Sequence, residues 1–175
     1  MKRLLLLRHG KAEGAASDDR KRALIARGKT DSARIGRFLR EDAYVPDAIF
    51  CSDSTRTRQT LEAMLPELQA KPELKYLSEL YLAEPELIFS LVRKVSDRLH
   101  SLMIIGHNPG LEQCALALAA VPLEKKLRKR YDVMDEKFPT CSVAVIDFEI
   151  DRWRDVTPGR GELDAFVRPK DLEEN

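Results

Sequence analysis

Short, unbroken apolar runs separated by longer amphipathic segments are the feature that most limits what this chain can fold into. Residues 4–7 and 102–105 each hold four consecutive large apolar side chains, and residues 47–51 form a third compact run after a proline. Runs of this length are typical of strands covered on both faces of a parallel sheet. Because segments with helical spacing lie between them, the alternation favours an α/β fold.

The same periodicity predicts the order of the elements. Strands are expected at residues 2–7, 47–51, 74–77 and 102–105, followed by an antiparallel pair at 141–148 and 153–156, and helices at 30–42, 52–68, 84–99 and 111–120. We expect a loop at residues 11–27, an irregular excursion or broken helix at 121–137, and a tail lying across the surface at 158–175. The prediction is a three-layer sandwich with a mostly parallel central sheet, an antiparallel edge and helices on both faces.

Length and charge set the broad class of the protein. The 175 residues predict a single domain over residues 1–175. The first apolar run is too short for a signal peptide, and no run reaches the roughly 18 apolar residues of a membrane span. Thirty Lys and Arg against 29 Asp and Glu give a net charge of +1, so no overall field attracts nucleic acid or an acidic membrane. The three separated cysteines fit a reducing compartment, and we expect a cytoplasmic protein.

Residues suited to an anionic substrate follow three of the predicted strands. Ligands of open α/β sheets bind at the carboxyl ends of the strands, so these segments are expected to converge in space. They are Arg8-His9-Gly10 after the first strand, residues 53–58 after the second, and Gly106-His107-Asn108 after the fourth. Their spacing does not suit a metal site, because HxxxH and CxxC are missing and two arginines would repel a cation. We expect neither a metal nor another cofactor.

These motifs resemble those of a known family. Arg8-His9-Gly10 after an N-terminal strand, the segment SDSTRTRQT at residues 52–60, and GHNPG at residues 106–110 are similar to the histidine phosphatase superfamily, which has the phosphoglycerate-mutase-like fold. The resemblance covers nearly the whole chain in order. The short length and residues 161–170 resemble the small SixA-type phosphohistidine phosphatases. The resemblance implies a phosphatase that forms a covalent phosphohistidine.

Chemistry and resemblance assign the same roles to the central residues. Arginine donates a planar fork of hydrogen bonds to a phosphoryl group, so Arg8 and Arg56 are expected to form a clamp. An imidazole with a free ring nitrogen can attack phosphorus, and His9 is the expected nucleophile. His107 is expected to bind the equatorial oxygens and to add positive charge there. Gly10 is expected to let the backbone approach the phosphate.

The general acid and the rim of the site are assigned by resemblance and position. Residues 77–81 resemble the segment that carries the acid in larger family members, which makes Glu79 the candidate. Asp18 and Asp19 are the alternatives, because the loop that contains them is expected to border the site. Arg22 is expected at the entrance. Asn108 either presents its backbone N–H to phosphate or caps the following helix.

The substrate is expected to be carried by a protein. The segment between Arg56 and His107 leaves no room for an inserted cap, so the site is expected to be open. We therefore predict a phosphatase that acts on phosphohistidine in a signalling or phosphotransfer protein, with no nucleic-acid or membrane partner. The alternatives are a phosphatase of small phosphate esters such as sugar phosphates, and a catalytically silent module that docks a phosphorylated partner. Arg58 and His100 are expected to lie outside the catalytic set.

Overall fold

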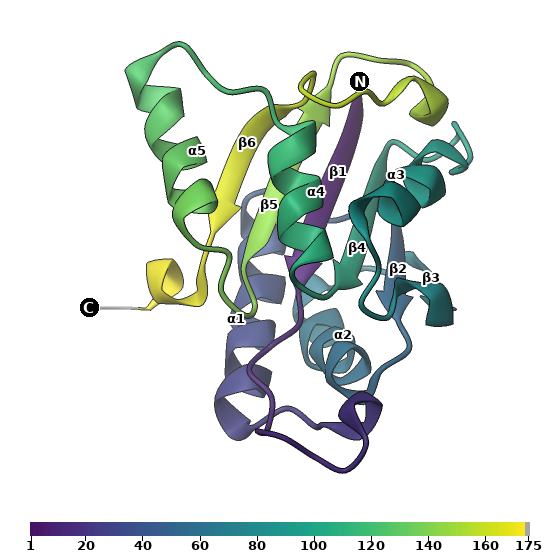
Figure 1. Cartoon of the computed structure of the whole chain (residues 1–175), viewed down its shortest axis with the longest axis vertical. Coiled ribbons are helices and arrows are strands. Elements are labelled where there is room, and N and C mark those ends of the chain that lie inside the picture. The colour runs from purple at the N-terminus through teal and green to yellow at the C-terminus, as the bar shows by residue number, and fades with distance from the viewer. Residues whose placement is uncertain (174–175) are drawn as a thin grey trace.

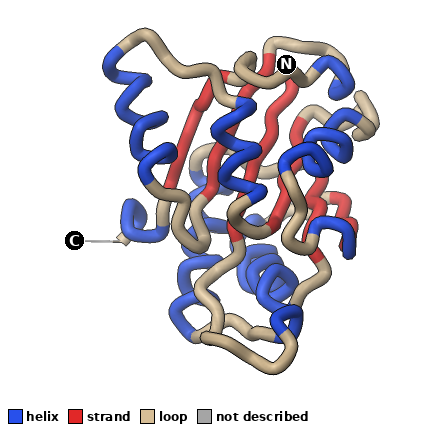
Figure 2. Tube along the Cα trace, in the orientation of Figure 1, coloured by secondary structure: helices blue, strands red, loops and turns tan. Residues whose placement is uncertain are grey.

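The computed structural model describes residues 1–173 and has a six-stranded sheet at its centre (Figures 1 and 2). The strand order is β3-β2-β4-β1-β5-β6. The strands are β1 (Lys2–Arg8), β2 (Ala48–Ser52), β3 (Glu73–Leu77), β4 (Ser101–Gly106), β5 (Val143–Phe148) and β6 (Glu162–Val167). The first four strands pair in parallel, whereas β5 is antiparallel to both β1 and β6. The predicted fold class is confirmed.

Helices cover both faces of this sheet (Figure 1). They are α1 (Ala26–Glu41), α2 (Thr55–Leu68), α3 (Pro85–Arg93), α4 (Gly110–Leu118) and α5 (Lys125–Glu136), with short 3-10 turns η1 (Asp19–Lys21), η2 (Ser78–Leu80), η3 (Trp153–Asp155) and η4 (Pro169–Leu172). α1 and α2 pack on one face, and α3, α4 and α5 pack on the other. No helix of the described residues is long and apolar enough to cross a membrane.

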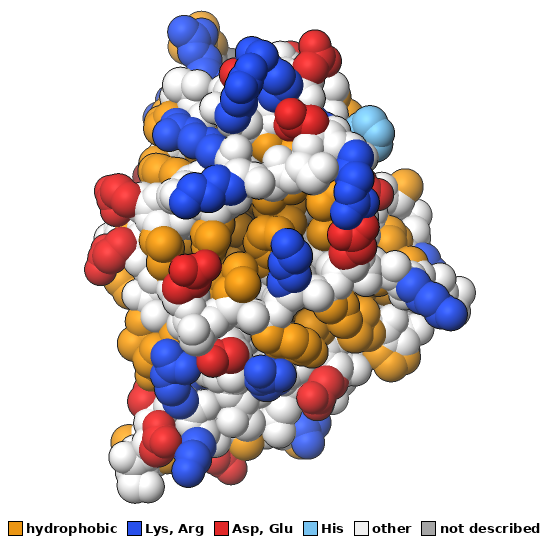
Figure 3. Space-filling model, turned by 90° about the vertical axis from the view of Figure 1, so that its right-hand side faces the viewer, with side chains coloured by type: hydrophobic (Ala, Val, Ile, Leu, Met, Phe, Trp, Pro, Cys, Tyr) orange, Lys and Arg blue, Asp and Glu red, His pale blue; other side chains and the backbone are white. Residues whose placement is uncertain are grey.

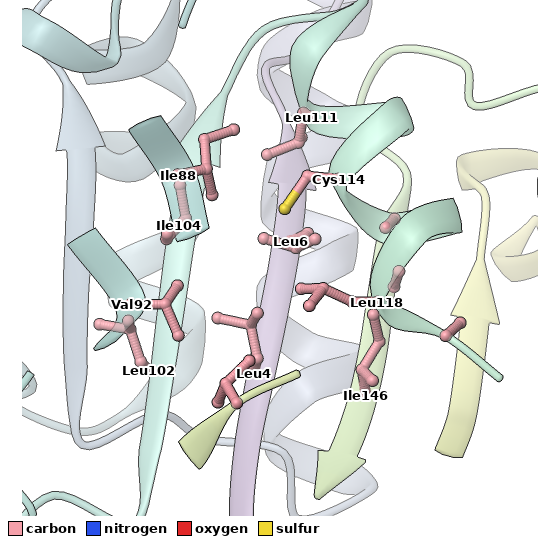
Figure 4. Close-up of a cluster of buried hydrophobic side chains, with 14 of the residues drawn as sticks. Leu4, Leu6, Ile88, Val92, Leu102, Ile104, Leu111, Cys114, Leu118 and Ile146 are labelled. Atoms are coloured by element: carbon pink, nitrogen blue, oxygen red, sulfur yellow. The ribbon is translucent and has the colours of Figure 1, made fainter. Parts of the chain in front are cut away.

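The unbroken apolar runs are explained by this double coverage. Successive side chains of a strand point to opposite faces, so a strand covered on both sides needs apolar residues at every position. In β1, Leu4 and Leu6 contact the cluster under α3 and α4 (Figure 4). Leu5 and Leu7 contact the cluster under α1 and α2. All four side chains are fully buried. At about 1.5–3 kcal/mol for each buried Leu, this strand contributes strongly to the core.

Residues 121–137 were expected to form an irregular excursion or a broken helix on the surface, and the structure shows one continuous helix there. They contain the 12-residue helix α5, whose inner side packs along β6 (Figure 1). Met134 is fully buried there, and Tyr131 is packed against the same core. The many charges of this segment obscured its short apolar stripe.

The antiparallel edge is confirmed, but one of its strands was misplaced. Residues 153–156 do not form a strand; Trp153–Asp155 form the turn η3, in which the Trp153 indole is fully buried and donates from Nε1 to the Leu99 carbonyl at 2.8 Å. The sixth strand is β6, which lies in the segment expected to be a surface tail. Leu163 and Phe166 are buried in it, and a register shift beside Val145 and Ile146 accommodates their uneven spacing.

Candidate active site

The site lies where β1, β2 and β4 end at the same edge of the sheet. Arg8 pairs in register with Gly106, and Cys51 pairs with Ile105, so the residues after these strands are neighbours. A cleft of about 410 Å³ opens there. Its lining residues are Arg8, His9, Lys11, Ala12, Asp19, Arg22, Arg56, Tyr81, Leu82, His107, Asn108 and Thr140. The three predicted segments therefore converge on one cleft.

His9 is held in the form that a nucleophile needs. Its side chain is buried, and Nδ1 lies 2.7 Å from the carbonyl oxygen of Gly10. Because a carbonyl only accepts hydrogen bonds, Nδ1 carries the proton and Nε2 keeps a free lone pair. Burial lowers the pKa of His9 to about 4, and the nearby positive charges of Arg56 and Arg8 act in the same direction. The imidazole is therefore neutral at pH 7.

His107 faces His9 across the base of the cleft. The two ring centroids are 5.4 Å apart, and the edge of Tyr81 approaches His107 with a centroid distance of 5.3 Å. His107 Nε2 lies 2.8 Å from Ser52 Oγ, while Nδ1 is buried without a partner among residues 1–173. If the serine hydroxyl donates to Nε2, then Nδ1 carries the proton and is a free donor.

The expected positive charge on His107 is not supported by this geometry. Burial lowers the pKa of His107 to about 3, and the neighbouring His9 acts in the same direction. His107 is thus neutral, and the positive charge of the cleft comes from its guanidinium groups and Lys11. A phosphoryl dianion bound in the cleft would oppose this lowering of the pKa.

Arg8 and Arg56 present buried donors. Arg56 is only 2% exposed although it is permanently charged, and it is placed by the first turn of α2, where Ser54 is the N-cap. Arg8 donates from Nη1 to the carbonyl of Phe138 at 3.0 Å. The Nε atoms of both arginines are buried without a partner within residues 1–173. Since a buried donor without an acceptor costs about 1–3 kcal/mol, these atoms are suited to bind the oxygens of an anionic ligand.

Asp19 reaches the cleft from the turn η1 in the loop after β1. Its carboxylate accepts from Arg56 Nη2 at 3.0 Å, from Arg22 Nη1 at 3.1 Å and from the hydroxyl of Tyr81. These hydrogen bonds, with that of Tyr81 first, hold the pKa of Asp19 far below its usual range. The carboxyl group is ionised at neutral pH and has no proton to donate.

Glu79, the predicted general acid, lies outside the cleft. It sits on the exposed turn η2 and lines a separate hollow of about 330 Å³ between β3 and α3, together with Lys75 and Lys94. Figure 3 shows this side of the molecule, where hydrophobic side chains gather between charged ones. Of the three carboxylates considered from the sequence, Asp19 is the one that lines the cleft.

Gly10 packs against α1 and does not line the cleft, although it was expected to lie beside the phosphate. Its amide donates to Thr60 Oγ1 at 2.9 Å and is therefore not available to a phosphate. A Cβ at this position would lie 2.8 Å from the carbonyl oxygen of Gly28 and 3.0 Å from Ser32 Oγ. The glycine is required because β1 leaves the sheet in close contact with the backbone of α1.

The remaining predicted residues divide between the cleft and its surroundings. Arg22 lines the cleft, as does Asn108, whose Nδ2 donates to the Phe138 carbonyl at 3.0 Å. Asn108 does not cap α4, which begins at Gly110 after Pro109. Arg58 donates to the carbonyl of Asp53 and stacks on Tyr76, away from the cleft. His100 is exposed at the opposite end of β4.

Sequence reasoning missed several residues of the site, Ser52, Tyr81 and Thr140 among them. Ser52 fixes the orientation of His107, Tyr81 contacts both His107 and Asp19, and Thr140 lines the cleft. Ser52 and Tyr81 lie in segments that the sequence analysis assigned to the site, so their location near the cleft could be predicted. Their contacts with His107 and Asp19 could not. Among residues 1–173, no group of three or more His, Cys, Asp or Glu side chains could hold a metal ion.

Comparison with known proteins gives consistent matches. The family model of the histidine phosphatase superfamily (branch 1) matches residues 4–84. An uncharacterized protein of Mycobacterium tuberculosis is 32% identical over 168 residues, which cover 94% of this chain and all of the relative. The crystal structure of a candidate SixA phosphohistidine phosphatase from Agrobacterium tumefaciens is 29% identical, with a TM-score of 0.78 over 96% of this chain and 98% of that one. Another candidate SixA, from Nakamurella multipartitia, is 26% identical, with a TM-score of 0.82 over 96% of both chains.

Proposed function

Because this chain belongs to the histidine phosphatase superfamily and is of the SixA type, we propose that it removes the phosphoryl group from phosphohistidine in another protein. The observation that carries the proposal is the neutral His9, whose free Nε2 faces a cleft lined by Arg8 and Arg56. A phosphoryl dianion needs donors for its oxygens and a nucleophile for its phosphorus, and this cleft offers both.

The reaction has two steps. Nε2 of His9 attacks phosphorus in line, a new P–N bond forms, and the P–N bond to the substrate imidazole breaks. Arg8 and Arg56 bind the phosphoryl oxygens during the transfer, and His107 donates from Nδ1 to the same group. Water then attacks the phosphoryl group on His9, which releases phosphate and restores the free imidazole. The proton that the water loses goes to phosphate or to the solvent.

The leaving group favours phosphohistidine over alkyl phosphate esters. A phosphohistidine protonated on its other ring nitrogen leaves as neutral imidazole, whereas an alkoxide needs a proton from the enzyme. None of the three carboxyl candidates meets that need, because Asp19 is held ionised, and Asp18 and Glu79 do not line the cleft. The cleft therefore suits a leaving group that needs no general acid, and the partner is a protein that carries a phosphorylated histidine.

Trapping of the intermediate tests the proposal. Rapid quenching with a labelled phosphohistidine protein, followed by separation of the two proteins by size, is expected to give an acid-labile, alkali-stable label on this chain in the native protein and in His100→Ala, and none on the chain of His9→Ala. The same label on the chain of His9→Ala would place the nucleophile elsewhere. Higher kcat/KM for sugar phosphates than for phosphohistidine proteins would instead favour the small-ester function.

A further inference from the structure

One acidic side chain lies among the cations of the cleft. Of the described residues that line it, Arg8, Lys11, Arg22 and Arg56 are positive, and Asp19 alone is negative. A carboxylate here repels any phosphoryl group and offsets part of the attraction of the arginines. In the proposed two-step reaction Asp19 neither binds the phosphoryl group nor transfers a proton, so its position among the cations needs a separate physical explanation.

The contacts of Asp19 resemble those of a bound anion. Two guanidinium groups and one phenol donate to its carboxylate, so Asp19 occupies donors of the cleft, Arg56 among them, as a bound anion would. The backbone carbonyl of Asp19 also accepts from Arg56 Nη1, at 2.7 Å. Both terminal nitrogens of Arg56 are therefore bound to a single residue, and the buried Nε is the donor that remains without a partner.

Asp19 reaches this position from an exposed segment. Its side chain is 47% exposed, whereas that of Arg56 is 3% exposed. The turn is anchored independently, because Arg20 forms an ion pair with Asp53 and Asp18 caps the turn by accepting from the Arg20 amide. A substitution that removes the charge of Asp19 therefore leaves these other contacts of the turn in place.

We propose that Asp19 is a positioning residue that holds Arg56 and Arg22 in place and keeps phosphate affinity low, so that the product leaves. The inference rests on the proposed function, since it takes phosphate as the ligand of the cleft. Binding that is equally strong for substrate and product adds nothing to turnover and slows release. A carboxylate that shares the arginines with the ligand reduces this uniform binding while it keeps the donors oriented.

Direct titration with inorganic phosphate tests this role without any turnover. Calorimetry is performed on the native protein, on Asp19→Asn and on Tyr81→Phe, which removes the hydroxyl that donates to Asp19. Asp18→Asn is the matched control, because this neighbouring exposed carboxylate has no hydrogen bond to either arginine among the contacts of residues 1–173. Asp19→Asn is expected to bind phosphate roughly tenfold more tightly, the scale of one charge-assisted hydrogen bond. Tyr81→Phe is expected to tighten binding by a smaller factor, and Asp18→Asn to leave it unchanged.

The sign of the effect decides the role. A residue needed only to keep the loop or Arg56 in shape would weaken phosphate binding when it is changed, so weaker or unchanged binding in Asp19→Asn overturns the proposal. If Asp19→Asn fails to fold, Tyr81→Phe carries the same test.

With turnover of a phosphohistidine protein, Asp19→Asn is expected to lower KM and to lower kcat through slower product release. A lower kcat with unchanged phosphate affinity would make Asp19 an acid catalyst instead. Absence of turnover in the native protein would refute the proposed function and leave the phosphate titration valid.

Discussion

Acidification is expected to destabilise the protein through His9 and His107, well before its carboxylates titrate. Both imidazoles are buried in the neutral form, with pKa values of about 4 and about 3, against an ordinary value of 6.5. The unfolded chain binds protons at these histidines once the pH falls below their ordinary pKa, and the folded chain does not. Stability is therefore fully present above about pH 6.5 and declines as the pH falls towards the native pKa values.

The size of the loss at pH 5 depends little on the exact native pKa values. About 1.5 pH units below the ordinary pKa, each unfolded histidine gains roughly 2 kcal/mol from proton binding, at about 1.36 kcal/mol per unit. Two buried histidines give roughly 4 kcal/mol together, a large share of a typical total stability of about 5–15 kcal/mol. Asp19 has a lowered pKa, so its contribution is lost only below the ordinary carboxyl range and does not overlap with this window.

Urea unfolding at about pH 7.5 and about pH 5 measures the effect, read as the difference in free energy of unfolding at an unchanged m-value. His9→Gln and His107→Gln are each expected to remove about half of the pH-dependent loss, because each variant removes one proton-binding group. His100→Gln is the control, since this side chain is exposed and remote from the cleft. A difference between the two pH values that is the same in all four proteins would refute the assignment to the buried pair.

Two further predictions concern single side chains near the cleft. Ser52→Ala removes the hydroxyl 2.8 Å from His107 Nε2, so we expect turnover to fall by roughly tenfold with little change in KM, measured by steady-state kinetics against Ser96→Ala, an exposed serine outside the cleft; an unchanged kcat would show that His107 needs no such support. Glu79→Gln is expected to leave hydrolysis of phosphohistidine and of alkyl esters unchanged, because Glu79 lines a different hollow; a selective loss on esters would restore it as the general acid.

The fold was predictable from the sequence where one physical requirement dominated each segment. Burial on both faces demands an apolar residue at every position, so β1 and β4 are visible as unbroken runs. The local composition of α5 and β6 does not predict them in this way. The charged residues of α5 outnumber its buried ones, and Asp164 interrupts the buried residues of β6. These elements are specified by packing against the rest of the chain.

The same reasoning explains the limits of the site prediction. Arg8, His9 and His107 follow directly from strand ends, and the register between β1 and β4 brings them together. Asp19 could only be an alternative, because its place depends on how an exposed loop folds back over 37 residues of sequence to contact Arg56. Glu79 was chosen from a segment that does reach the cleft, but the contact is made by Tyr81, two positions later.

The chemistry of the cleft separates two tasks, binding phosphate and attacking it, that one histidine cannot perform in the same protonation state. A protonated imidazole binds phosphate well but cannot attack it, because its lone pair is taken. Burial resolves this conflict by keeping His9 neutral and leaving the positive charge to the guanidinium groups of Arg8 and Arg56. The same burial lowers the stability of the protein in acid, because the folded state binds protons at these histidines less readily than the unfolded state does. The expected acid sensitivity and the proposed role of His9 as the nucleophile therefore follow from one feature of the fold, the deep placement of His9 and His107 at the ends of β1 and β4.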